Sequence, residues 1–452
     1  MTPSLLPESN YDDVVASMKP PSNDPQIIQT PLRNPSLQVT ADHQLKFVEA
    51  PVYAPRRGEV LLQIKATGIC GSDIHFWKSG RIGQLVFEGD CIIGHEAAGV
   101  VLRCGEGVTK FKPGDRVAVE PGVPCEQCFL CNDGRYNLCE DVQFAGVYPY
   151  AGTLQRYKVH PAKWLHKLPD GFSYAEGALL EPLSVVMRGI QVARLNLGRG
   201  VVVCGAGPIG LIALAAARAS GAHPIVITDV ELRRLAFAKE IVPSCITYQV
   251  DLAKDAQDNA LAIRALFGDS EYVAPEAVLE CTGVESSVCT AAYTARRGGV
   301  VVVIGVGKAT MNNLPFMHMS LAEIDLRFIN RYRDTWPSAI ACLSDSFQID
   351  YATCGLATAT SVPSGARHDT PADAEPSDSR GDHSSSKLQT IKAFKLLHSP
   401  HPPSTFCALK VASTPSFDES TGYDCRPFLR TSIMIKTVDL SLQFPRPPDS
   451  CL

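Results

Sequence analysis

Residues 201–229 read VVVCGAGPIGLIALAAARASGAHPIVITD, and this stretch decides the fold. The apolar run VVVC is followed by GAGPIG, then by a helical run and a second apolar strand. In this context Gly205 makes a tight turn, Gly207 lets a pyrophosphate approach, and Gly210 allows close helix–strand packing. The amino terminus of the helix then faces the diphosphate. The stretch predicts a dinucleotide-binding unit, the alternative being a glycine turn without a ligand.

An acid closes the second strand of this unit. Asp229 stands nineteen residues after Gly210, where a carboxylate accepts hydrogen bonds from the adenosine ribose and repels a 2′-phosphate. This favours NAD over NADP. Arg234 keeps NADP open, because a nearby arginine accommodates that phosphate. In the alternative interpretation Asp229 is a solvated strand end.

Apolar strands and helical runs continue to alternate downstream. AVLECTG (277–283) and GGVVVVIGVG (298–307) are the next strands, and such alternation predicts a parallel sheet covered on both faces. The apolar run 201–219 approaches the length of a membrane span. Its glycines and proline fit a strand-to-helix break in a buried unit better.

The preceding region has another character. From about 36 to 180, short apolar strands alternate with Gly and Pro, for example EVLLQIKATG and AAGVVLRCG. This pattern predicts a β-rich domain of barrel type. We therefore expect a flexible arm (1–35), the β-rich domain (36–180), a nucleotide-binding domain (181–320), a partial return to the first domain (321–350) and a tail (351–452).

The tail is compositionally biased. Of its 102 residues, 36 are Ser, Thr or Pro, and we expect most of it to be disordered. Within it, MIKTVDLSLQF is a possible strand.

Bulk composition excludes some functional classes. The 452 residues carry a net charge of -5, so no basic footprint argues for nucleic acid. The start, MTPSLLPESNYDDVV, lacks the pattern of a secretory signal. With sixteen cysteines and no signal, reduced thiols and metal ligands in the cytoplasm are the better interpretation than a disulfide framework.

Four cysteines lie within residues 125–139, which read CEQCFLCNDGRYNLC. Thiolates at these offsets wrap one tetrahedral ion, and zinc fits with sulfur at about 2.3 Å. Iron–sulfur clusters use similar spacings, so the ligand set alone does not fix the metal. Because Cys125, Cys128, Cys131 and Cys139 fill the shell with sulfur, we expect a structural site.

A second, mixed set of donors lies upstream and downstream of this loop. GICGSDIH (68–75) and GHEAAG (94–99) offer Cys70, His95 and Glu96, and LLEPLS (179–184) adds Glu181 in an apolar setting. Singly, each is more often structural or solvated. Together with a dinucleotide site they predict a catalytic zinc, which has three protein ligands and an exchangeable position.

With these sets in place, the chain resembles the zinc-dependent medium-chain dehydrogenases, specifically their polyol dehydrogenase branch. The resemblance covers residues 36–350 and rests on nine segments: GICGSDIHFWKSGRIG, IIGHEAAG, the four-cysteine loop, GRYNLCE, LLEPLSV, GAGPIG, ECTGVESS, VIGVGK and INRYRDTWP. It implies an α/β fold, in which a GroES-like, barrel-like catalytic domain holds an inserted Rossmann nucleotide-binding domain. It also implies NAD, two zinc ions per subunit (one catalytic and one structural), and a homotetramer.

The resemblance implies roles for individual residues. Ser72 and His75 would relay the substrate proton, with turn chemistry as the alternative, and Glu181 would approach the catalytic zinc directly or through water. Arg331 and Tyr332 would border the polyol, with surface or subunit packing as the alternative. The implied cofactor contacts are Gly205, Gly207, Pro208, Ile209, Gly210, Asp229, Arg234, Ile304, Ile329, Asn330 and Arg331.

The implied reaction is the zinc-dependent oxidation of a secondary hydroxyl of a polyol (L-arabinitol, sorbitol or xylitol) to the ketose with reduction of NAD+. An alcohol or threonine dehydrogenase is the alternative within enzymes, and a catalytically impaired NAD-binding protein is the alternative outside them. The second alternative arises because YATCGLATATSVPSGARHD replaces the family's closing segment after SDSFQID. We hypothesise a mis-spliced or frame-shifted product, in which strands of the first domain stay unpaired.

Overall fold

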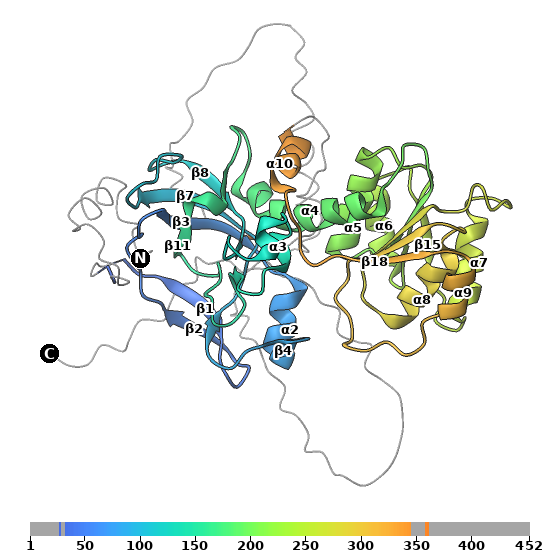
Figure 1. Ribbon diagram of the computed structural model, residues 1–452, viewed down its shortest axis with the longest axis horizontal. Helices are drawn as coiled ribbons and strands as arrows, with labels where there is room; N and C mark the ends of the chain where they lie inside the picture. Colours follow the sequence, from blue (N-terminus) through green and yellow to red (C-terminus); the bar gives the residue numbers. More distant parts are fainter. Residues whose placement is uncertain (1–26, 29–31, 345–357, 361–452) are drawn as a thin grey trace, which may run out of the picture. The chain divides into compact units, whose positions relative to one another are not determined.

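The structure is a computed structural model that describes residues 27–28, 32–344 and 358–360 (Figure 1). These residues all belong to one of the two units into which the chain divides. Most of the expected arm and tail, including MIKTVDLSLQF, lies outside the described residues.

An antiparallel sheet organises the first half of the chain, in the order β11-β3-β7-β8-β12. Its strands and those of the small sheets around it are β1 (Pro35–Val39), β2 (Leu45–Glu49), β3 (Glu59–Gly68), β4 (Arg81–Ile82), β5 (Leu85–Val86), β6 (Cys91–Ile92), β7 (Ala97–Cys104), β8 (Arg116–Val119), β9 (Gly122–Val123), β10 (Gln143–Phe144), β11 (Tyr157–Pro161) and β12 (Leu165–Lys167). The helices of this half are α2 (Gly71–Ser79), α3 (Phe129–Asn132), η1 (Tyr136–Leu138) and η2 (Ala162–Trp164). Apolar residues of β3, β7 and β8 alternate into a common core, as the pleat requires. The β-rich domain expected from the sequence is confirmed.

Strand β3 has two neighbours along one edge. Residues 59–63 pair with β11, and residues 66–68 pair with β19 (Thr358–Thr360) from the carboxy-terminal segment. The expectation that the altered tail leaves this domain's strands unpaired is thus wrong for β3. The physical reason is that backbone pairing depends little on side-chain identity, and Thr-Ala-Thr contains two β-branched residues that favour extended backbone.

A six-stranded parallel sheet forms the second half, in the order β15-β14-β13-β16-β17-β18. Its elements are β13 (Val201–Cys204), α5 (Pro208–Ala219), β14 (Ile225–Asp229), α6 (Leu232–Ile241), β15 (Ile246–Gln249), α7 (Ala256–Ala265), β16 (Ala277–Glu280), α8 (Glu285–Thr294), β17 (Val300–Val303), α9 (Phe316–Leu321) and β18 (Asp325–Phe328). Strands β13, β14, β16 and β17 are buried along their whole length, as expected of a parallel sheet covered by helices. The sheet runs to Phe328, past the boundary at residue 320 that the sequence suggested. The sequence pattern missed β18 because this edge strand is only partly buried and lacks a long apolar run.

Helix α4 (Tyr174–Ala193) spans the expected boundary at residues 180–181. Ser173 caps it by accepting the Glu176 N–H at 3.1 Å, while the Glu176 carboxylate accepts the Ser173 N–H, a capping box. The helix packs against β7 and β8 as well as against α5, β16 and β17. Helix α10 (Trp336–Ser344) packs on α4 in turn. Glu181 therefore lies in a helix shared by both halves.

The apolar run 201–219 divides into β13 and α5, as expected. Across the described part of the chain, every helix is too short or too polar to cross a membrane.

Candidate active site and metal centres

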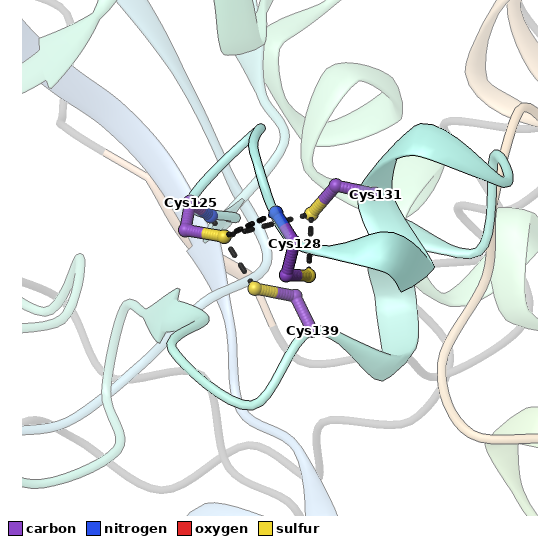
Figure 2. A group of neighbouring side chains, drawn as sticks. All are labelled: Cys125, Cys128, Cys131 and Cys139. Atoms are coloured by element: carbon purple, nitrogen blue, oxygen red, sulfur yellow. Dashed lines mark hydrogen bonds between the residues drawn. The ribbon is translucent and has the colours of Figure 1, made fainter.

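The four expected sulfur ligands come together in a lobe formed by residues 125–139 (Figure 2). The Sγ atoms of Cys128 and Cys131 lie 3.4 Å apart, and those of Cys125 and Cys131 lie 3.9 Å apart. A tetrahedron with Zn–S bonds of about 2.3 Å has sulfur–sulfur edges of about 3.8 Å. The quartet therefore fits a zinc ion without rearrangement of the loop.

Backbone N–H groups of the lobe donate to two of the sulfurs, and they support negative charge on Cys125, while burial raises the pKa of Cys131 and of Cys139. The Cys128 N–H donates to Cys125 Sγ, and the Cys125 N–H donates to Cys139 Sγ, each at 3.3 Å. Backbone N–H groups of Gln127 and Cys128 lower the pKa of Cys125 to about 7. Such donors favour the thiolate, which is the form that binds a metal.

The second expected metal centre is also assembled. One ligand atom each from Cys70, His95 and Glu96 lies within 4.8 Å of the other two. Cys70 precedes α2, and the other two lie between β6 and β7, with only 6% and 7% of their surfaces exposed. Burial raises the pKa of the Cys70 thiol. Burial and the nearby Glu181 carboxylate raise the pKa of Glu96 to about 8.

Such crowding of buried acids is unfavourable without a cation. Sulfur, nitrogen and oxygen donors at one point match the ligands of a catalytic zinc. The residues present therefore fit the metal. Glu181 is outside the 4.8 Å group, but it is buried in α4 and its charge acts on Glu96.

Asp73 is a site residue that the sequence analysis did not single out. It is 1% exposed and accepts the N–H groups of Cys70 and Gly94, both at 2.9 Å. Its Oδ1 lies 3.5 Å from Nδ1 of His95. Burial disfavours the charged imidazole, but the Asp73 carboxylate raises the pKa of His95 above its usual value. The signal in the sequence was a Cys-x-x-Asp spacing at a helix start, typical of a capping box.

The expected relay residues lie on one face of α2. Ser72 and His75 are three positions apart, so they are neighbours on the helix surface. Ser72 is partly buried, and His75 is exposed. Exposure therefore rises from Ser72 to His75 along α2, while their role as a relay stays a prediction.

The glycine loop after β13 has the expected geometry. Gly205 has a φ of +94°, and a Cβ on Gly210 would overlap the carbonyl oxygen of Gly205. A Cβ on Gly207 would meet no atom within 4 Å, so this position is open to a ligand. Pro208 and Ile209 begin α5, with Pro208 in the first helical position, where its missing N–H costs no hydrogen bond. The loop therefore fits a diphosphate at the start of α5.

Asp229 has a second role beside the expected one. Its carboxylate accepts the N–H groups of Ala206 at 2.7 Å and Glu231 at 2.9 Å. The guanidinium of Arg234 lies 3.6 Å from the same carboxylate. Asp229 thus ties the end of β14 to the glycine loop and is a fixed acid, which fits an adenosine ribose.

The segment after β18 carries the remaining expected residues. Ile304 and Ile329 pack against Gly189 of α4. Arg331 has a φ of +56°, and its guanidinium lies 3.8 Å from the centre of the Phe144 ring.

Tyr332 is buried, with 3% of its surface exposed, and Arg331 is partly buried. Burial lowers the pKa of Arg331. Burial and the charge of Glu181 raise the pKa of Tyr332. A surface position, one of the alternatives from the sequence, is therefore wrong for Tyr332, while the role of both residues at a site stays a prediction.

The four-cysteine lobe also forms hydrogen bonds with residues 330–334, which follow β18. Asn137 donates to the carbonyl of Asn330 at 2.8 Å, and the Tyr136 hydroxyl accepts the Asp334 N–H at 2.8 Å. Arg333 donates to the carbonyl of Gly134 at 3.3 Å. These contacts join positions almost 200 residues apart, which no local pattern reveals.

Comparisons with known proteins agree with this geometry. Residues 56–170 match the alcohol dehydrogenase GroES-like domain, and residues 208–345 match the zinc-binding dehydrogenase model. The chain is 54% identical to an L-arabinitol 4-dehydrogenase from Aspergillus oryzae over 288 residues, 63% of this chain and 75% of that protein. It is 42% identical to a sorbitol dehydrogenase from Mus musculus, over 69% of this chain and 85% of that protein.

Solved structures are similar in fold. L-idonate 5-dehydrogenase from Escherichia coli is 28% identical with a TM-score of 0.62, covering 70% of this chain and 88% of its own. 2R,3R-butanediol dehydrogenase from Bacillus subtilis is 26% identical with a TM-score of 0.61, covering 71% and 94%. The chain therefore belongs to the zinc-binding dehydrogenases with a GroES-like domain, within their polyol dehydrogenase branch.

Proposed function

We propose that this protein oxidises a secondary hydroxyl of L-arabinitol, or of a related polyol such as sorbitol or xylitol, to the ketose with reduction of NAD+. The observation that carries the proposal is the group formed by partly buried Cys70 and buried His95 and Glu96, which combines three donor types at one point. L-Arabinitol is placed first because relatives of that name are 50–54% identical to the chain, against 42% for a sorbitol dehydrogenase.

Two zinc ions and NAD are the cofactors. When bound, the catalytic zinc supplies a Lewis acid that lowers the pKa of the alcohol, and NAD+ supplies the hydride acceptor. Cys70, His95 and Glu96 hold this zinc, Glu181 acts on the same centre, and the four-cysteine lobe holds the other ion. Asp229 binds the adenosine ribose.

The chain's own side chains place the substrate and move its proton. Ser72 accepts the proton of the reacting hydroxyl while it gives its own proton to His75, and His75 releases a proton to solvent, since their burial falls in that order along α2. Arg331 offers several N–H donors and Tyr332 one hydroxyl, which suit the row of hydroxyls of a polyol.

Two competing functions are separated by one experiment. An alcohol or threonine dehydrogenase would have the same metal and cofactor but another substrate, and an NAD-binding protein would lack turnover. Absorbance of NADH is followed with L-arabinitol, sorbitol, xylitol, threonine and ethanol, and zinc is measured on the same sample. We expect two zinc ions per chain and the highest kcat/KM with a polyol.

A matched variant checks the assignment of the site. Glu96→Ala is expected to abolish turnover while NAD binding is kept. Full activity of this variant, or turnover confined to ethanol or threonine, contradicts the proposal.

We also infer a homo-oligomer in the cytoplasm. Large apolar side chains of α9 and β18, among them Phe316, Leu321 and Phe328, are at least 68% exposed, which supports a subunit contact on this side of the parallel sheet. The twelve cysteines of the described residues are free, which supports a reducing compartment. Light scattering of the purified protein tests the first inference, a monomer contradicting it, and fluorescence microscopy of a tagged copy tests the second.

A further inference from the structure

Glu280 is a buried acid without a cationic partner among the described residues. It ends β16 and is 0% exposed. Its carboxylate accepts hydrogen bonds from the backbone N–H of Thr282 at 3.0 Å and of Gly283 at 2.9 Å. It also accepts from the hydroxyls of Thr282 and Ser287. All four partners are neutral donors, so both oxygens must accept.

These hydrogen bonds fold the loop 281–284 back onto the end of its own strand. The Cys281 N–H donates to the carbonyl of Cys204, and the Val284 N–H donates to the Thr282 hydroxyl, each at 3.0 Å. A carboxylate at position 280 therefore specifies the shape of the whole loop. In either orientation, an amide at this position would turn its NH2 group toward the N–H of Thr282 or of Gly283, and both of these groups are donors.

The shaped loop interlocks with its neighbours. A Cβ on Gly205 would lie 2.7 Å from the Thr282 methyl group. On the other side, a Cβ on Gly305 would overlap the backbone of Gly283, and one on Gly283 would overlap Val306. Backbones approach this closely only where glycine leaves out a side chain. The loop 281–284, which the Glu280 side chain holds, thus packs between the loops after β13 and β17.

The order of the strands indicates which half of the cofactor the loop 281–284 faces. In a parallel sheet, a dinucleotide lies across the carboxyl ends of the strands. Asp229, on the adenosine side, ends β14, which lies on one side of β13, while Glu280 ends β16 on the other side. The loop 281–284 therefore lies on the side away from the adenosine, where the nicotinamide half belongs.

We propose that Glu280 is a positioning residue for the nicotinamide half of the cofactor, acting through the loop 281–284 and touching neither substrate nor zinc. This inference rests on the NAD assignment made above. It distinguishes the two halves of the cofactor: the adenosine half depends on Asp229 and the glycine loop, and the nicotinamide half depends on Glu280.

The test compares Glu280→Gln with the unaltered protein by calorimetric titration of NAD+ and of ADP-ribose, which lacks the nicotinamide. Loss of hydrogen bonds to a charged acceptor corresponds to about a 10- to 100-fold loss of affinity. We expect that loss for NAD+, a change within about twofold for ADP-ribose, and an unchanged content of two zinc ions. The matched control is Glu276→Gln, because Glu276 precedes the opposite end of β16 and pairs with Arg199 and Arg296; it should leave the ratio of the two affinities unchanged.

Ser287→Ala covers the case in which Glu280→Gln does not fold. It removes one of the four donors, and we expect NAD+ binding to weaken about threefold with ADP-ribose binding unchanged. Equal losses for both ligands, or no loss for either, overturn the proposal, since Glu280 would then support the sheet alone or have no role. If the unaltered protein binds neither ligand, the proposed function fails instead.

Discussion

Gly68 and Glu96 are in such close contact that a Cβ on Gly68 would overlap the Oε2 atom of Glu96. The Gly68 N–H also donates to the carbonyl of Glu96 at 2.7 Å. The end of β3 therefore sets the position of Glu96, a predicted metal ligand that stands 28 residues later in the chain.

Gly68→Ala should displace the Glu96 carboxylate and empty the catalytic metal site. We expect zinc content to fall from two ions per chain to one and kcat/KM to fall at least about 100-fold, as misplacement by about 1 Å does. Gly71→Ala is the control, because a Cβ there meets no atom within 4 Å; it should keep both ions. Two ions bound in the Gly68 variant would contradict the steric argument.

Asp73→Asn tests the carboxylate that accepts the Cys70 N–H and lies 3.5 Å from Nδ1 of His95. Asparagine keeps one acceptor but presents N–H donors to Cys70 or to Gly94, whose own N–H groups already point at this side chain. Removal of such a partner of a metal ligand lowers metal affinity about 10- to 100-fold, which competition with a zinc chelator measures. Asp90→Asn, an exposed acid that accepts from Gln38, is the control, and equal zinc affinities in both variants would count against Asp73.

Much of this architecture was predictable from local pattern. Buried runs such as VVVC and VVVV, the glycine spacing and the four-cysteine loop each report on contacts within a few residues. What remained hidden depends on contacts between distant segments. The role of Asp73 was not evident from local pattern, since its contact with His95 spans 22 positions of the sequence. Glu280 drew attention only as part of a family motif, because its burial and its donors become visible only when the loop is folded.

The burial of Tyr332 is information that the sequence did not contain. Arg331 and Tyr332 were equally compatible with a surface and with a site, because long polar side chains do both. Burial excludes the surface for Tyr332, and the ring of Phe144 lies against the guanidinium of Arg331.

His160 predicts a loss of stability in acid. It is 3% exposed, and its Nε2 lies 2.9 Å from the carbonyl oxygen of Glu120. Burial lowers its pKa to about 3, whereas an unfolded histidine titrates near 6.5. The unfolded state therefore binds a proton first as pH falls. Stability is full above about pH 6.5 and declines toward pH 3.

At pH 5 this group should cost about 2 kcal/mol of unfolding free energy relative to pH 7.5. His160→Gln keeps an N–H donor for Glu120 but does not titrate, so its stability should depend less on pH by that amount. Urea unfolding of both proteins at the two pH values measures the difference. Parallel pH profiles would show that His160 is not the responsible group.

The four-cysteine lobe contacts residues 330–334, so its structural effect extends beyond residues 125–139. Asn137 and Tyr136, which hold Asn330 and Asp334, belong to the turn that ends at Cys139. Loss of the ion in the lobe should therefore loosen the segment that carries Arg331 and Tyr332.

Cys128→Ser is expected to lower zinc content from two ions per chain to one, because a serine hydroxyl is a poor substitute for a thiolate ligand. Amide hydrogen exchange should accelerate in residues 125–139 and in residues 330–334, and kcat/KM for the polyol should fall at least about 10-fold through the loosened segment. Cys342→Ser is the control, since Cys342 lies on α10 outside both ligand groups, and it should keep both ions. Faster exchange confined to residues 125–139, with segment 330–334 unchanged, would contradict the coupling while leaving the metal site itself in place.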